Sequence, residues 1–249
     1  FTHARNIGTI IEQDRVVAHV DPVENQPLMI EKALKYIDER AEAGGPFFLY
    51  FPMCPPHEPV VPAAEYVGQS GAEDIVRNDP RYGDWVYQGD AMLGQILDAL
   101  ERHQLTDETL VIATSDNGAE HRPYPPLRES KRSIYEGGHR VPFVTRWPGR
   151  VKAGSVTHET VCLNDLMATA AEIVGATLPD DAGEDSVSLL GLLRRGNAES
   201  PVREATVHQS SAGDLAIRQG PWKQIFFRDG RRELYNLESD PKEHNNLEQ

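Results

Sequence analysis

The sequence predicts an α/β fold that is followed by a small antiparallel β subdomain. Segments with helical periodicity alternate with short apolar runs rich in aromatic and β-branched residues, and this pattern changes near residue 200. Amphipathic helices that alternate with buried strands are typical of a sheet with right-handed crossovers. The short segments that follow, separated by Gly, Asp and Pro, are typical of an antiparallel sheet.

Helices and strands are expected in the following order. Apolar residues at helical spacing predict helices over residues 28–43, 84–103 and 164–174, the first of them ended by Gly44 and Gly45. Ser186 is expected to cap a short helix. Apolar runs too short for helices predict a strand buried on both faces over residues 46–51 and another buried strand over residues 109–114, and a third strand is expected over residues 141–147. Four further strands form the C-terminal sheet, over residues 205–209, 215–219, 222–227 and 233–237.

Composition and charge exclude several classes of protein. The 249 residues are 39% hydrophobic and 26% charged, which is ordinary for a globular chain. A net charge of −14 repels polyphosphate backbones, so no nucleic acid partner is expected. No apolar run approaches the roughly 18 residues of a membrane-spanning helix. Cys54 and Cys162 are too few for a thiolate metal cluster, and a disulfide between them stays open.

Three clusters of polar residues lie beyond the expected strands, where α/β sheets bind ligands. His57 follows residues 46–51 in a proline-rich loop, and alone it reads as a surface histidine. Asp116 and Asn117 follow residues 109–114 and offer hard oxygen ligands for Ca²⁺ or Mg²⁺, although such a pair more often forms a turn. The third cluster is a basic loop that forms either an anion site or a solvated surface, with Arg128, Lys131, Arg132, His139 and Arg140.

The order of these clusters resembles the type I sulfatases, which are formylglycine-dependent, arylsulfatase-like enzymes of the alkaline phosphatase superfamily. The resemblance runs from about Pro46 to the end of the chain. It rests on Phe-Phe-Leu-Tyr-Phe-Pro with Pro-His-Glu-Pro, on Tyr-Glu-Gly-Gly-His-Arg-Val-Pro within residues 127–148, and on the tail over residues 233–247. It implies an alkaline phosphatase-like sheet sandwiched by helices, with its N-terminal part missing. We therefore expect residues 1–198 to be the C-terminal portion of the catalytic domain and residues 199–249 to be the small antiparallel subdomain.

The resemblance also implies roles for single residues. Asp116 and Asn117 match two ligands of one calcium ion. His57 and Lys131 match the catalytic residues that contact the sulfate, and His121, just after the metal pair, is expected to contact the substrate. A proton donor or cation that neutralises the leaving oxygen of a sulfate ester is consistent with these roles.

The family's nucleophile is absent from this sequence. A formylglycine forms from Cys or Ser in a Cys/Ser-x-Pro-x-Arg motif, and neither Cys54 nor Cys162 lies in one. The paired N-terminal aspartates of the calcium site and the Lys-x-His motif are also missing. We therefore expect the chain to be the C-terminal part of a sulfatase, with the nucleophile in the missing half, and to be inactive by itself.

Two alternatives to a sulfatase remain at this stage. A phosphodiesterase or phosphonate monoester hydrolase of the same superfamily typically has Asp-His where this chain has Asp116-Asn117. A histidine ligand suits zinc, whereas the amide oxygen of Asn117 suits calcium, so Asn117 favours a sulfatase. A non-catalytic module that binds sulfated glycans is the other alternative. The substrate, a sulfated small molecule or a glycan, and the oligomeric state stay open. Localisation is unknown, although family analogy suggests an exported protein.

Overall fold

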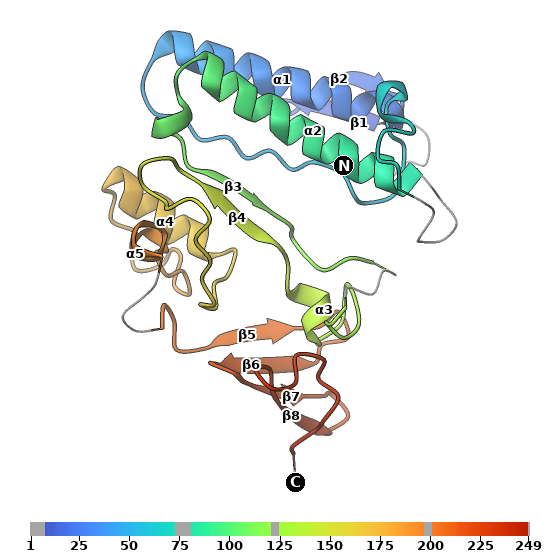
Figure 1. Ribbon diagram of the computed structural model, residues 1–249, viewed down its shortest axis with the longest axis vertical. Coiled ribbons are helices and arrows are strands. Elements are labelled where there is room, and N and C mark those ends of the chain that lie inside the picture. Colours follow the sequence, from blue (N-terminus) through green and yellow to red (C-terminus); the bar gives the residue numbers. More distant parts are fainter. Residues whose placement is uncertain (1–7, 73–80, 121–124, 197–200, 249) are drawn as a thin grey trace. The chain divides into compact units, whose positions relative to one another are not determined.

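Residues 8–72, 81–120, 125–196 and 201–248 are described by the computed structural model (Figure 1). They fall into two units, within Phe1–Thr109 and Leu110–Gln249.

The first unit is built on two long helices, α1 (Pro22–Ala43) and α2 (Arg81–Arg102), which pack side by side (Figure 1). Helix α1 begins at Pro22 rather than at residue 28, because Asp21 caps it. The Asp21 carboxylate accepts a hydrogen bond from Val23 N, and the Glu24 carboxylate accepts one from Asp21 N. Apolar residues of both helices form the core of this unit: Ile30, Ala33 and Met92.

A β-hairpin that the sequence analysis missed precedes α1. Strands β1 (Gly8–Glu12) and β2 (Arg15–Val20) pair antiparallel across a turn in which Gln13 and Asp14 have positive φ angles. Two short 3-10 helices, η1 (Ala64–Tyr66) and η2 (Thr106–Glu108), flank α2 in the chain.

The buried strand predicted over residues 46–51 is not present. This segment forms no ladder with another described strand, and Phe48 and Tyr50 are 78% and 77% exposed. The alternate side chains Leu49 and Phe51 pack against the core of α1 and α2. The segment therefore has the two-residue alternation of a strand, but among the described residues only the face with Leu49 and Phe51 is covered.

The second unit begins with β3 (Val111–Thr114), which pairs antiparallel with β4 (Phe143–Arg146). The short helix α3 (Glu136–His139) precedes β4 in the chain, and α4 (Asp165–Val174) and α5 (Leu190–Arg195) follow it. The expected right-handed crossovers are not observed, because every strand pair in the described residues is antiparallel.

The C-terminal antiparallel sheet is confirmed. Its strands follow one another in sequence order: β5 (Thr206–Gln209), β6 (Leu215–Gln219), β7 (Trp222–Phe226) and β8 (Arg232–Asn236). One face of this sheet packs on the segment just before α3 and forms a core with it, made of Ile134, Tyr135, Ala216, Ile225, Tyr235 and Leu237. This packing connects the subdomain to the loop of the predicted site.

Ser186 does not cap α5, contrary to the prediction. Its hydroxyl accepts a hydrogen bond from Ala168 N and donates one to Asn164 O, so it ties α4 to the segment before α5. The side chain that bonds the start of α5 is Ser188, whose hydroxyl accepts a hydrogen bond from Leu190 N.

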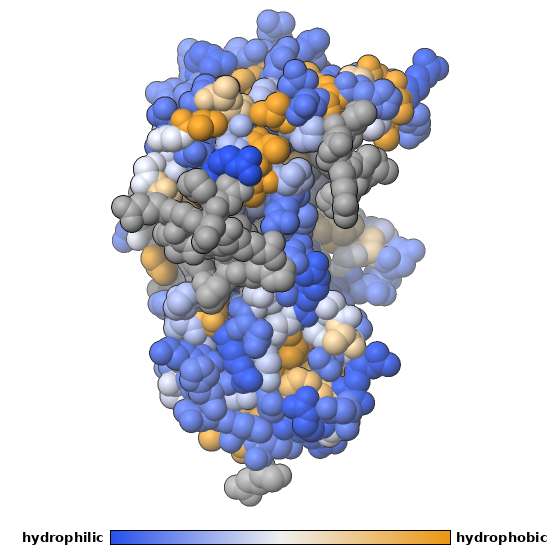
Figure 2. Space-filling model, turned by 90° about the vertical axis from the view of Figure 1, so that its right-hand side faces the viewer, coloured by the Kyte–Doolittle hydropathy of each residue, from blue (hydrophilic) through white to orange (hydrophobic). Residues whose placement is uncertain are grey.

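The surface is mostly hydrophilic, with scattered hydrophobic patches on the face shown in Figure 2. Exposed apolar side chains gather on the outer face of the C-terminal sheet: Val207, Leu215, Ile217, Trp222 and Phe226. None of the helices in the described ranges is both long enough and apolar enough to cross a lipid bilayer.

Candidate functional site

Asp116 and Asn117 lie in the turn that directly follows β3. The chain leaves the β3–β4 ladder after Thr114, and the Ser115 hydroxyl then donates a hydrogen bond to Asn117 O (3.1 Å). Asp116 is exposed and Asn117 is half-buried. Neither side chain has a hydrogen-bond or ion-pair partner in the described part of the chain. Their oxygen atoms therefore remain available to a ligand or to water.

Backbone contacts hold this turn against the loop that carries Lys131 and against α3, which directly follows that loop. Gly118 N donates a hydrogen bond to Gly138 O, and Lys131 N donates one to Ala119 O, both at 3.0 Å. The approach at Gly118 is so close that a Cβ atom there would lie 1.8 Å from Gly137 O. The structure therefore brings the Asp116–Asn117 turn and the backbone of Lys131 together within the second unit.

The Lys131 loop contains two residues in the left-handed region of backbone conformation. Glu129 has a φ of 61° and Arg132 a φ of 77°, values that non-glycine residues rarely adopt. Such conformations persist only where the surrounding structure imposes them, and they occur often at binding sites. Here the surrounding structure includes the hydrogen bond from Gly137 N to Arg128 O at 2.9 Å.

Most of the basic cluster around Lys131 is paired with protein groups. Arg132 forms an ion pair with Glu120, and both His139 and Arg140 lie within ion-pair distance of Glu136. The Arg128 guanidinium also has protein partners. It donates hydrogen bonds to Glu243 O and to the Tyr235 hydroxyl, and it lies over the Tyr135 ring. Among the described residues of the cluster, Lys131 alone has an ammonium or guanidinium group without a hydrogen-bond or ion-pair partner. It is half-buried, which suits a cation that binds an anionic group.

The partner of this cluster is Glu136, a residue that the sequence analysis did not single out. Its carboxylate is 1% exposed and lies 3.1 Å from the Nζ of Lys223, which is fully buried in β7. Burial raises the pKa of the Glu136 carboxyl, but the hydrogen bond from His139 and the charges of Lys223 and Arg218 outweigh it and hold that pKa well below its usual range. The alternation of residues along β7 could have indicated this buried ion pair. It puts Lys223 on the same face of the strand as the apolar Ile225, and a lysine on a buried face needs an acidic partner.

His57 lies in the first unit, in the loop that precedes η1. Its backbone is held by hydrogen bonds from His57 N to Cys54 O (2.7 Å) and from Trp85 Nε1 to His57 O (2.9 Å). The exposed imidazole donates from Nδ1 to Glu58 O at 2.6 Å, because a carbonyl oxygen can only accept. The position of His57 relative to Lys131 stays a prediction, since the two residues belong to different units.

Other predicted features are resolved only in part. His121 lies outside the described residues. Cys54 and Cys162 are free thiols, and burial raises the pKa of each, which disfavours a thiolate nucleophile.

Within the described ranges, no three His, Cys, Asp or Glu side chains are grouped so that they could hold a metal ion. Asp116 and Asn117 fit calcium in donor type, but they supply two of the six to eight oxygens that it takes.

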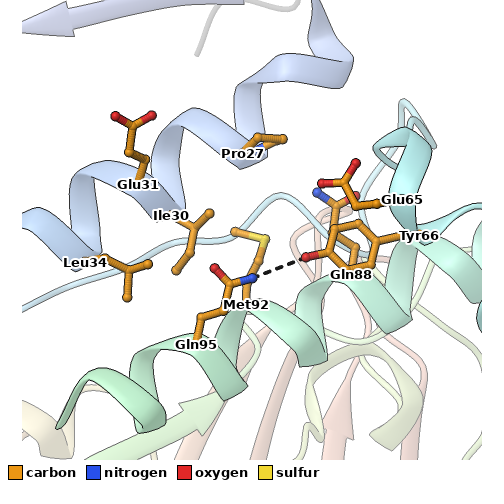
Figure 3. Close-up of a pocket in the computed structure, with 9 residues that line it drawn as sticks. All are labelled: Pro27, Ile30, Glu31, Leu34, Glu65, Tyr66, Gln88, Met92 and Gln95. Atoms are coloured by element: carbon orange, nitrogen blue, oxygen red, sulfur yellow. Dashed lines mark hydrogen bonds between the residues drawn. The ribbon is translucent and has the colours of Figure 1, made fainter. Parts of the chain in front are cut away.

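A groove of about 240 Å³ in the first unit does not resemble a sulfate site (Figure 3). It lies between α1 and α2, and a hydrogen bond from Gln95 Nε2 to Tyr66 Oη (3.2 Å) joins two of its lining residues. Its charged lining residues are the carboxylates Glu31 and Glu65, and no cation lines it. It therefore offers no charge to balance an anionic group.

Comparison with known proteins places the chain in a family. The Sulfatase family model matches residues 23–176, which is more than half of the chain. The chain belongs to the sulfatase family. A second family model, the C-terminal region of N-sulphoglucosamine sulphohydrolase, matches residues 128–249, which include the Lys131 loop and the C-terminal sheet.

Named sulfatases match most of this chain. An N-acetylgalactosamine-6-O-sulfatase of Bacteroides thetaiotaomicron is 33% identical over 88% of the chain and 47% of its own length. The human N-acetylgalactosamine-6-sulfatase is 35% identical over 82% of the chain and 40% of its own length. The chain thus spans about half the length of the curated sulfatases that it matches.

Solved structures agree with this assignment. A sulfatase from work on glycosaminoglycan metabolism by Bacteroides thetaiotaomicron has a TM-score of 0.80 and 31% identity, over 92% of this chain and 51% of that one. A phosphonate monoester hydrolase of Agrobacterium radiobacter has a TM-score of 0.68 at 19% identity, over 89% of this chain and 56% of that one, and so shares the fold. The predicted fold class, an alkaline phosphatase-like α/β fold with a C-terminal antiparallel sheet, is confirmed.

Proposed function

We propose that the protein containing this chain hydrolyses sulfate esters, with Asp116 and Asn117 as calcium ligands and with Lys131 and His57 at the sulfate. Membership of the sulfatase family supports the reaction. The observation that carries the site is the pair of backbone hydrogen bonds, at Gly118 and Lys131, that hold the Asp116–Asn117 turn against the Lys131 loop. Oxygen ligands for a cation, held close to the backbone of a lysine whose ammonium group has no partner among the described residues, suit a bound divalent anion.

Each residue has a distinct task in this proposal. Lys131 attracts a sulfate oxygen, because an ammonium group that has lost part of its hydration binds an anion more strongly than one in bulk water. His57 donates a proton to the leaving oxygen of the ester, on which negative charge develops as the bond to sulfur breaks. Bound calcium would polarise the sulfuryl oxygens. The nucleophile is expected outside these 249 residues, which contain no Cys/Ser-x-Pro-x-Arg motif.

The proposed substrate class is a sulfated glycan, and the first candidate carries a 6-O-sulfate on N-acetylgalactosamine. The names of the bacterial and human relatives, at 33% and 35% identity, support this choice. Human arylsulfatase A, at 34% identity over 81% of the chain, makes an aryl sulfate the natural second substrate to test.

The experiment begins with the complete reading frame that contains this sequence. We expect it to encode a Cys/Ser-x-Pro-x-Arg motif, and we expect the purified full-length protein to bind one calcium ion and to release sulfate from 6-sulfated N-acetylgalactosamine. A Lys131→Ala variant serves as the control for the site. A complete reading frame without the motif would favour a non-catalytic glycan-binding module. Two transition-metal ions, with turnover of phosphonate esters rather than sulfate esters, would favour the phosphonate hydrolase alternative.

A further inference from the structure

Three ionisable side chains are buried together in the second unit. Lys223 and Glu243 are 0% exposed, and Glu136 is 1% exposed. Lys223 Nζ lies 3.1 Å from Glu136 Oε1 and 2.8 Å from Glu243 Oε1. A buried charge without a partner is strongly unfavourable, so these three side chains are tolerated inside the protein because they pair with one another and, at Glu136, also with Arg218.

The three side chains come from three separate segments of the chain. Glu136 is the first residue of α3, Lys223 belongs to β7, and Glu243 follows β8. Glu243 Oε2 also accepts a hydrogen bond from Glu136 N at 2.7 Å, and Arg218 of β6 donates to Glu136 Oε2 at 3.3 Å. These hydrogen bonds attach the start of α3 to the C-terminal sheet. Because charge-assisted hydrogen bonds are directional, they set the orientation of α3 as well as its distance from the C-terminal sheet.

Glu243 contacts both ends of the loop that carries Lys131. At one end, its side chain accepts the hydrogen bond from Glu136 N. At the other end, its main-chain oxygen accepts a hydrogen bond from the Arg128 guanidinium at 2.7 Å. The Arg128 guanidinium also lies over the Tyr135 ring, with Cζ 3.7 Å from the ring centre. The backbone between residues 128 and 136 is thus fixed at both ends by the C-terminal tail.

We propose that Lys223 is a positioning residue for the sulfate-binding loop, which it fixes through Glu136 and Glu243 so that Lys131 faces the ligand next to Asp116 and Asn117. This inference rests on the proposed function of Lys131. It makes the C-terminal sheet part of the apparatus that binds sulfate, although none of its residues is proposed to touch the substrate.

The test uses three variants of the full-length protein. Lys223→Met removes the cation and leaves two carboxylates buried, so it is expected to unfold more readily. The double variant Lys223→Met/Glu243→Gln also removes one of those negative charges and is expected to recover most of the thermal stability, because an uncompensated buried charge is the main source of the loss. The matched control is Arg203→Met, which breaks the buried ion pair with Asp165 that joins α4 to the segment before β5.

Three quantities are measured for each variant: the melting temperature, amide hydrogen exchange in residues 128–136, and the affinity for inorganic sulfate by calorimetry. Both Lys223 variants are expected to exchange faster in residues 128–136 and to bind sulfate about tenfold more weakly, the effect of losing one well-oriented charge-assisted contact. Arg203→Met is expected to lower the melting temperature with no change in either of the other two quantities.

The inference is overturned if the double variant shows wild-type exchange in this loop and wild-type sulfate affinity, or if Arg203→Met alters both as much as the Lys223 variants do. The double variant decides the question even if Lys223→Met does not fold. A wild-type protein that neither binds sulfate nor hydrolyses sulfate esters contradicts the proposed function. Faster exchange in residues 128–136 would still support the positioning role in that case, so the two failures are distinguishable.

Discussion

Replacing Gly118 with alanine is expected to separate the Asp116–Asn117 turn from the Lys131 loop. An alanine Cβ would lie 1.8 Å from Gly137 O, whereas ordinary contact begins at 3.4 Å, so the two backbones must move apart by about 1.6 Å. Overpacking of this kind costs about 1–3 kcal/mol of folding free energy, and the hydrogen bond from Gly118 N to Gly138 O contributes about 1 kcal/mol. We therefore expect Gly118→Ala to destabilise the full-length protein by about 2–4 kcal/mol.

The same displacement is expected to lower activity. A misplacement of about 1 Å in a catalytic site can reduce the rate about 100-fold, so kcat/KM for the sulfate ester should fall by about that factor. Stability is measured by urea unfolding and activity by steady-state kinetics. The reasoning is refuted if Gly118→Ala keeps both the stability and the kcat/KM of the wild type.

Gly94→Ala is a matched control with the opposite expected sign. Gly94 lies inside α2, and no heavy atom lies within 4 Å of the position that its Cβ would take. Because alanine favours a helix interior over glycine, this variant should gain about 0.5–1 kcal/mol and keep its activity. Neither Gly94 nor Gly118 has a positive φ, so the contrast isolates the effect of space.

Three further predictions follow from the site and its surroundings. Lys131→Ala should weaken sulfate binding about tenfold and leave the melting temperature unchanged, since Lys131 has no partner among the described residues. Calorimetry and a thermal melt check this, and a lower melting temperature would contradict it. Burial lowers the pKa of His208 from 6.5 to about 3, so between these values the unfolded chain binds a proton that the folded chain does not. Stability should therefore fall as the pH falls through this window, by at most about 1.4 kcal/mol per pH unit. Urea midpoints should fall less steeply with decreasing pH for His208→Gln, and equal slopes would contradict the assignment. The 249-residue chain by itself should not release a phenol from an aryl sulfate, and measurable release would refute that.

Local patterns predicted α1, α2, α4, α5 and the C-terminal sheet, although not α3, because the residues that form each of them are close neighbours in the chain. The apolar spacing within α2 and α4, and the alternation within β5 to β8, could be read without any knowledge of distant segments. Residues 46–51 show the limit of this approach. Their composition indicated a strand covered on both faces, whereas coverage depends on which other segments lie beside them, and Phe48 and Tyr50 are exposed.

For the candidate site too, the sequence predicted some features and only the structure showed others. The sequence identified Asp116, Asn117, Lys131 and His57 as candidates by their order and their resemblance to a family, and their roles stay predictions. It also left open whether five basic residues form one anion site or a solvated surface. In the structure, four of the five interact with protein groups, and Lys131 is left without a partner in the described part of the chain.

By itself, the sequence determined the family and most of the secondary structure, because motifs and periodicity are properties of neighbouring residues. Only the tertiary structure decided which charges in the described residues are paired and that the charge of Lys131 has no partner there. Glu136 and Lys223 are 87 residues apart in the chain, yet their side chains meet at 3.1 Å in a region closed to water. A charge is stable there only with its partner, and the fold, through the packing of the C-terminal sheet on α3, is what supplies that partner.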